Sequence, residues 1–184
     1  LVETIYKSLN KPKVKIVKSN HDEFLTRYLE NGRYTDDPIN HYISLKIATA
    51  LFEKEDVLKR GFEVVGQNTF DWEFLPRDCT DKIGKIECGA HGDLGMNGSF
   101  PSLASFERIY GDCVVGHNHS AAIHRGVFRV GTMSHYDLGY NRGPSSWTQT
   151  NCLVYENGQR QLLNMFGGKC TTSTAELYKR SSKV

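Results

Sequence analysis

Several features of membrane-bound and secreted proteins are missing from this 184-residue sequence. No apolar run approaches the roughly 20 residues that a membrane-spanning helix needs, and no signal-peptide pattern opens the chain. The five cysteines are odd in number and form no Cys-x-x-Cys pair, which argues against a disulfide framework and a structural zinc knuckle. These absences favour a reduced, cytoplasmic setting without membrane contact.

Charge of one sign is also missing, because the net charge is only +2. A field this weak attracts no polyanion over the whole surface, so a nucleic acid would have to be held at a local site. The length suits a single domain with a real core. We expect one domain over residues 1–170, and a poorly ordered tail over 171–184 that has little apolar surface to bury.

The first part of the chain predicts a strand followed by two helices. Apolar residues over 14–17 indicate the strand, and "SNHD" then leads into a helix for which Asn20 or Asp22 supplies the cap. A second, longer helix is predicted over "PINHYISLKIATALFEKEDVLKRG", with an apolar stripe from Ile39 to Leu51 and Gly61 just past its end.

The second part is richer in strands. Strands are predicted in "WEFLP", "GKIECGAHGD" (ending at His91), "DCVVGHNH" and "HRGVFRVGTM", and "SLASFERIY" predicts a short helix with Ser102 as its cap. The Asn-Gly pair in "ENGQ" predicts a hairpin between two apolar runs. Strands alternating with helices and then a β-rich end indicate an α/β or α+β layered fold.

Imidazole and amide side chains follow three of these strands. Asn20 and His21 follow the first, His91 a middle one, and His117 and His119 a later one. Residues i and i+2 of an extended segment point to the same side, so we expect His117 and His119 to face one pocket. Such ligands suit two divalent ions about 3.5 to 4 Å apart. Manganese fits best, iron, zinc and magnesium remain open, and calcium is disfavoured.

Three motifs in this order, "SNHD", "AHGD" and "GHNH", resemble the later motifs of the calcineurin-like metallophosphoesterases. The resemblance covers nearly the whole chain and implies the C-terminal half of that domain, a β-sandwich flanked by helices. Carried over, it makes Asn20, His91 and His117 ligands of one metal and His119 a ligand of the other. It places His21 near the scissile phosphate, to stabilise or protonate the leaving oxygen, with Asp22 orienting its ring.

The block from His91 to Thr132, with "YNRGPSSW" after it, is more narrowly similar to phage-encoded members linked to DNA degradation. This resemblance implies a DNase acting on phosphodiester bonds, in the host cytoplasm if the protein is phage-encoded. Two alternatives stay open: a phosphatase or phosphodiesterase acting on a small nucleotide or phosphoprotein, and a noncatalytic assembly or regulatory subunit. A homo-oligomer is also compatible with the sequence.

The chain departs from the family pattern in two places. Ser19 stands where the family has glycine, which removes no ligand. The early Asp-x-His motif, which supplies a bridging carboxylate, does not occur in the 184 residues. Without that carboxylate two cations would repel one another. We therefore expect the chain to be incomplete as an enzyme, with the N-terminal half of the domain as its partner in the same or another polypeptide.

Three further residues are candidates for supporting roles. Arg142 is a candidate phosphate clamp and His135 a candidate substrate contact, while Asp93 is placed to accept the other ring N–H of His91. Each also has a simpler interpretation, as an exposed loop residue or a surface carboxylate. The candidate metal ligands and the candidate catalytic histidine have such alternatives too: a helix cap for Asn20, a packed histidine for His21, and a chance pair for His117 and His119.

Overall fold

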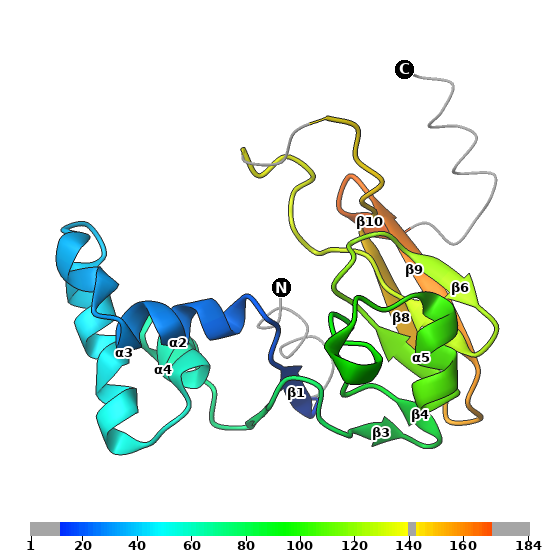
Figure 1. Ribbon diagram of the computed structural model, residues 1–184, viewed down its shortest axis with the longest axis horizontal. Coiled ribbons are helices and arrows are strands. Elements are labelled where there is room, and N and C mark those ends of the chain that lie inside the picture. The colour runs from blue at the N-terminus through cyan, green and yellow to red at the C-terminus, as the bar shows by residue number, and fades with distance from the viewer. Residues whose placement is uncertain (1–11, 140–142, 171–184) are drawn as a thin grey trace. The chain divides into compact units, whose positions relative to one another are not determined.

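A computed structural model describes residues 12–139 and 143–170 of the chain, which divides into two compact units, Leu1–Arg77 and Asp78–Val184 (Figure 1). Helices and several sheets are both present, so the predicted mixed α/β class is confirmed. The assignment of residues 1–170 to one calcineurin-like domain stays a prediction. The predicted tail, 171–184, lies outside the described residues.

The first unit consists of two short parallel strands and a group of helices between them. Its elements are β1 Val14–Val17, α2 Asp22–Glu30, the 3₁₀ turn η1 Arg33–Asp36, α3 His41–Glu53, α4 Val57–Val64 and β2 Trp72–Leu75. Strands β1 and β2 pair in parallel, with Val14 opposite Trp72 and Val17 opposite Leu75. Phe62 of α4 packs against the ring of Trp72, with the ring centroids 5.5 Å apart.

Helix α2 begins with a reciprocal pair of hydrogen bonds between Ser19 and Asp22. The Ser19 N–H donates to Asp22 Oδ2 at 2.7 Å, and the Asp22 N–H donates to Ser19 Oγ at 3.2 Å. This reciprocal pattern is that of a capping box whose first residue lies two positions before the N-cap, and each side chain satisfies the other residue's backbone donor. The prediction that Asn20 or Asp22 is the cap was wrong, because His21 is the residue at the N-cap position and makes no side-chain cap bond.

The long helix predicted up to Gly61 is two helices. Lys54 adopts a left-handed conformation (φ 56°) and ends α3, and Asp56 then accepts hydrogen bonds from the N–H groups of Leu58 and Lys59 to start α4. Gly61 therefore lies inside α4 instead of ending a helix. The apolar periodicity continued through both helices and concealed the break, whose local signal was the Asp56 cap.

The core of the first unit gathers residues from α2, α3 and α4. Its buried members are Leu29, Ile47, Ala48, Ala50 and Val57. The apolar stripe predicted from Ile39 to Leu51 is buried only in part. Ile39, two residues before α3, is 87% exposed, and Ile43 is 43% exposed. Leu29 and Ile47 are therefore part of the buried core, whereas the N-terminal end of the stripe is exposed to solvent.

The second unit contains two sheets and one α-helix among its described residues. Its elements are β3 Lys82–Ile83, β4 Ile86–Glu87, the 3₁₀ turn η2 Met96–Gly98, α5 Leu103–Tyr110, β5 Cys113–Val115, β6 Ala122–His124, β7 Val127–Arg129, β8 Thr150–Val154, β9 Arg160–Phe166 and β10 Lys169–Cys170. The larger sheet has the order β3-β4-β5-β7-β6, and the smaller has the order β10-β9-β8. Strands β4, β5 and β7 run parallel to one another.

Two strand predictions in this unit needed correction. The segment ending at His91 leaves the sheet after Glu87, four residues earlier than predicted. The segment "HRGVFRVGTM" is not one strand, because β6 and β7 form an antiparallel hairpin whose turn holds Arg125 in a left-handed conformation (φ 48°). The helix capped by Ser102 and the hairpin of β8 and β9 are confirmed, with the Ser105 N–H donating to Ser102 Oγ.

The core of the second unit lies between α5 and the larger sheet. Cys113, Val115 and Val127, from the neighbouring strands β5 and β7, are at most 1% exposed and pack with Phe106 of α5. The central strand β5 thus carries two buried residues, Cys113 and Val115, within the three positions before the Gly-His-x-His segment begins. A well-packed strand immediately before a loop restricts where that loop can start.

Arg160 joins the smaller sheet to the larger one. Its side chain, on β9, is only 8% exposed, and Nη2 lies 2.7 Å from Asp112 Oδ1. Nη1 donates to the carbonyls of Gly126 and Cys113, and the guanidinium stacks over the Phe128 ring at 4.5 Å. One buried cation therefore satisfies two carbonyls beside the β6–β7 turn.

Replacing Arg160 with methionine should destabilise the protein by about 2 to 4 kcal/mol, because two partly buried carbonyls lose their donor. Urea denaturation followed by far-ultraviolet circular dichroism measures this change. Arg125→Met is the matched control, since the Arg125 side chain is 75% exposed and pairs with Glu107 at the surface. Equal midpoints for the two variants would show that Arg160 does not join the sheets energetically.

Candidate functional site

The chain between β4 and His91 is held by two acidic side chains, Glu87 and Asp78, that the sequence did not single out. Glu87, 3% exposed at the end of β4, accepts hydrogen bonds from the N–H groups of Asp81 and Gly89. Asp78 Oδ1 accepts the N–H of His91 at 3.0 Å. A buried carboxylate is tolerated when backbone donors surround it, so these contacts specify the path from β4 to His91.

His117 reaches the same place from β5. Its neighbour Gly116 donates its N–H to the carbonyl of His91 at 2.9 Å, which joins the two loops. The rings then meet, with His117 Nδ1 3.2 Å from His91 Nε2 and an interplanar angle of 79°. Because β4 and β5 are parallel, their carboxyl ends lie at one edge of the sheet, where α/β folds place ligand sites.

A close approach of glycine backbones permits this meeting. Gly92 has φ +106°, and a Cβ at that position would lie 3.1 Å from the carbonyl oxygen of Gly116 and 3.2 Å from its nitrogen. A side chain at residue 92 would therefore push the His91 and His117 loops apart.

The predicted reason for His117 and His119 to face one pocket was wrong. Neither residue is extended: His117 has φ 66° and His119 has φ 62°, both in the left-handed region. Residues other than glycine rarely adopt this conformation, and it costs of order 1 kcal/mol or more at each position. The surrounding contacts must compensate for this strain, which is typical of residues held for a function.

His119 packs against an aromatic partner. Its ring meets Trp147 edge to face, with the ring centroids 4.5 Å apart, and its carbonyl accepts the N–H of Thr148. Trp147 is half-buried and packs against His119. Phe100 approaches His117 in a similar way at 6.4 Å. Aromatic edges thus lie beside both histidines of the "GHNH" segment.

The His91–His117 pair has the spacing of two ligands on one metal ion. Two nitrogens that bind one tetrahedral ion at about 2.1 Å lie about 3.4 Å apart, close to the 3.2 Å between Nε2 and Nδ1. A hydrogen bond between neutral rings gives the same spacing. Within residues 12–139 and 143–170, no group of three or more histidine, cysteine, aspartate or glutamate side chains is arranged to hold a metal ion. The structure therefore brings two predicted ligands together.

The three predicted residues of the "SNHD" motif lie in the first unit, where α2 begins. His21 is exposed and packs against the Phe24 ring at 5.3 Å, and Asn20 is half-buried. Asp22, expected to orient the ring of His21, uses its carboxylate to accept both the N–H and the hydroxyl of Ser19. Its predicted role toward His21 stays a prediction.

The remaining candidates are less defined. His135 is exposed, Asp93 is half-buried two residues after His91, and Arg142 lies outside the described residues, as does its neighbour Tyr140. The supporting residues Glu87 and Asp78 were missed at the sequence level. Nothing in their local sequence distinguishes them from surface carboxylates.

The cysteines are free thiols, and two of them adjoin this region. Burial raises the pKa of Cys113, on β5, to about 11, and it raises the pKa of Cys88, after β4, to about 11. Both thiols therefore stay protonated at neutral pH. Since the thiolate is the form that acts as a nucleophile, burial lowers the reactivity of both thiols.

Comparison with known proteins shows a similarity to a phage protein. Protein A1 of Escherichia phage T5 is 42% identical over 163 residues, an alignment that covers 84% of this chain and 29% of that protein. The chain therefore spans less than a third of the length of this relative. No protein-family model matches the sequence, and no solved structure matches it. The expected similarity to a phage protein is confirmed, whereas membership of the metallophosphoesterases stays a prediction.

Among the helices that the structure describes, none is long and apolar enough to cross a membrane.

Gly92→Ala should destabilise the protein by at least twice as much as Gly98→Ala. Both glycines have positive φ, but a Cβ at Gly98 meets nothing within 4 Å, so the difference isolates the close approach to Gly116. The expected cost at Gly98 is about 1 kcal/mol from backbone strain alone. Chemical denaturation of both variants measures the difference, and equal losses would argue against a tight contact between the two loops.

Proposed function

We propose that this chain is part of a metal-dependent phosphoesterase that hydrolyses phosphodiester bonds in DNA. The observation that carries the proposal is the His91–His117 pair, two imidazole nitrogens 3.2 Å apart that follow adjacent parallel strands. Close pairs of imidazoles at such an edge suit a divalent transition metal. The left-handed conformation of His117 supports the same interpretation, because it holds the ring there at a cost in backbone energy.

The substrate class rests on similarity. The chain resembles phage-encoded metallophosphoesterases in its motifs. Over 84% of its own length it is 42% identical to a phage T5 protein. In the second unit the resemblance adds His119 as a ligand of a second ion, with manganese as the favoured metal. The missing carboxylate ligands would come from residues outside this chain.

Each candidate site residue has a defined task in this proposal. His91 and His117 would hold a divalent cation, which supplies Lewis-acid polarisation of a phosphoryl oxygen and lowers the pKa of a bound water. His21, exposed at the start of α2, is accessible to a substrate and donates a proton to the leaving oxygen. Trp147 and Phe100 restrict the rings of His119 and His117.

A second candidate is a noncatalytic assembly or regulatory subunit. The observation that favours it is that the described residues offer no group of three side chains arranged for a metal. Under this interpretation the His91–His117 contact is a structural hydrogen bond between neutral rings. Metal content of the purified natural protein separates the two candidates, because the subunit would fold normally without two bound ions.

His117→Ala should lower metal occupancy in the natural protein, since it removes a ligand from the first ion. Elemental analysis after dialysis against manganese measures the stoichiometry. His41→Ala is the control, because His41, on α3, is not among the proposed ligands and its Nδ1 lies 3.0 Å from the carbonyl oxygen of Tyr34. Two ions retained in His117→Ala would refute the ligand assignment.

His21→Ala should keep the metals and lose activity by about a hundredfold or more, the usual scale for removing a positioned acid. The assay follows cleavage of plasmid DNA beside hydrolysis of a chromogenic phosphodiester, both with manganese. Activity on the small ester without cleavage of DNA would favour a small-nucleotide phosphodiesterase. Near-normal turnover by the metal-loaded variant would remove His21 from the mechanism.

A further inference from the structure

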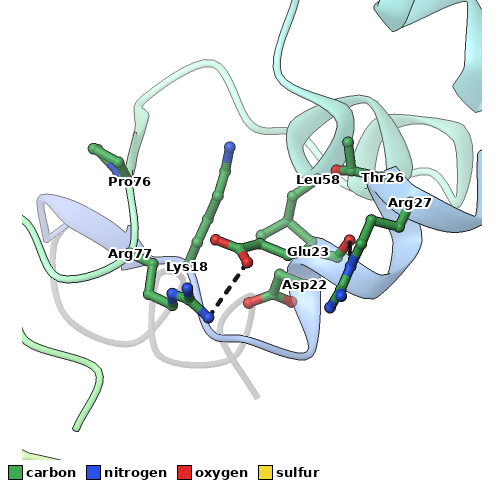
Figure 2. A pocket seen from close by; sticks show the side chains of 8 residues that line it. All are labelled: Lys18, Asp22, Glu23, Thr26, Arg27, Leu58, Pro76 and Arg77. Carbon is green, nitrogen blue, oxygen red and sulfur yellow. Dashed lines mark hydrogen bonds and ion pairs between the residues drawn. The ribbon is translucent and has the colours of Figure 1, made fainter. Parts of the chain in front are cut away.

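A pocket of about 380 Å³ opens in the first unit beside the "SNHD" segment (Figure 2). It lies where the parallel strands β1 and β2 end and α2 begins. Its lining residues come from the residue after β1, from α2 and α4, and from the segment after β2: Lys18, Asp22, Glu23, Thr26, Arg27, Leu58, Pro76 and Arg77. The carboxyl ends of adjacent parallel strands commonly form ligand sites.

Three cationic side chains line the pocket from three different segments. Lys18 follows β1, Arg27 is on α2, and Arg77 follows β2. Arg27 lies with its guanidinium 4.6 Å over the Phe24 ring, and among the described residues no carboxylate lies within ion-pair distance of it. Planar guanidinium groups with a fixed fork of donors suit phosphate oxygens.

The carboxylate of Glu23, a residue that lines the pocket, already pairs with Arg77, and an anionic ligand could replace it there. Glu23 Oε2 lies 3.3 Å from Arg77 Nη1 (Figure 2). The Glu23 side chain is 42% exposed and the Arg77 side chain 23% exposed. Lys18 pairs with Asp56, outside the lining, and Asp22 is held by Ser19. Ion pairs with this exposure contribute about 0 to 1 kcal/mol. A phosphate oxygen can therefore take the place of the Glu23 carboxylate at Arg77.

The position of the pocket indicates which phosphate it receives. Asp22 lines it, and Asp22 is the residue directly after His21, the proposed proton donor. A substrate whose scissile group lies at His21 would extend past Asp22 into the pocket. The aliphatic surfaces of Leu58 and Pro76 suit the sugar between two phosphates.

We propose that this pocket binds a backbone phosphate of the nucleic acid, next to the phosphodiester that is cleaved, with Arg27 and Arg77 as its ligands and Glu23 as the group it displaces. The inference rests on the proposed function, from which it takes the location of the scissile bond. A contact of this kind positions the strand and carries no base specificity.

Opposite charge changes at the two ends of one ion pair test the assignment. Arg77→Gln and Arg27→Gln should each weaken binding of a fluorescent oligonucleotide about three- to tenfold, and should reduce the slope of log affinity against log salt by about 1. Glu23→Gln should strengthen binding, because the competing anion is gone. Lys46→Gln, on α3 and outside the pocket, is the control and should leave binding unchanged.

Binding is measured by fluorescence anisotropy of the full chain in EDTA, with circular dichroism melts to confirm folding of each variant. If Arg77→Gln does not fold, Arg27→Gln and Glu23→Gln carry the test. Affinities and salt slopes unchanged in the folded pocket variants would overturn the inference. So would a mononucleotide that binds as tightly as the oligonucleotide and responds equally to the variants, since the site would then be a small-nucleotide pocket.

The absence of metal separates this test from the proposed function. Pocket-dependent binding in EDTA together with no cleavage by the metal-loaded natural protein would refute the phosphoesterase while supporting the phosphate pocket. Cleavage of DNA that is unaffected by all three pocket variants would support the phosphoesterase and refute the pocket.

Discussion

The parallel pairing of β4 with β5 is the constraint on which the candidate site depends. It aligns the carboxyl ends of two short strands, and the hydrogen bond from Gly116 to the His91 carbonyl continues that alignment into the loops. The rings of His91 and His117 meet because their backbones are already joined. The glycines at 92 and 116 permit the approach, while Glu87 and Asp78 hold the His91 side of the contact.

Buried side chains and the Arg160 guanidinium of the second unit stabilise the strands that lead to this edge. Cys113 and Val115 of β5 are buried with Val127 of β7, and the Arg160 guanidinium binds the carbonyls next to the β6–β7 turn. A strand of three residues has few hydrogen bonds of its own, so its position depends on this packing. Residues distant in sequence, on β9 and α5, therefore support the loop that carries His117 and His119.

The first unit organises its own edge by a different means. Its strands also run parallel, but the turn after β1 is stabilised by the reciprocal hydrogen bonds between Ser19 and Asp22. Three basic side chains are among those that line the adjoining pocket. Ser19, the departure from the family pattern, thus forms part of the helix start. The same short segment supplies the capping box, the proposed proton donor His21, and one wall of the proposed phosphate pocket.

Local sequence was sufficient for several elements: the strand over 14–17, the helix capped by Ser102, and the Asn-Gly hairpin follow from periodicity and turn chemistry that act within a few residues. It was insufficient where two signals overlapped, as at Lys54, where apolar periodicity continued across a left-handed residue. The sequence by itself determined which residue types follow the strands, and so singled out His91, His117 and His119. Only the tertiary structure decided that the first two of these meet at 3.2 Å, that His119 packs on Trp147, and that Glu87 and Asp78 hold the loop. The physical reason is that these contacts join strands and loops far apart in the chain, and their geometry depends on sheet order and left-handed backbone that no local pattern encodes.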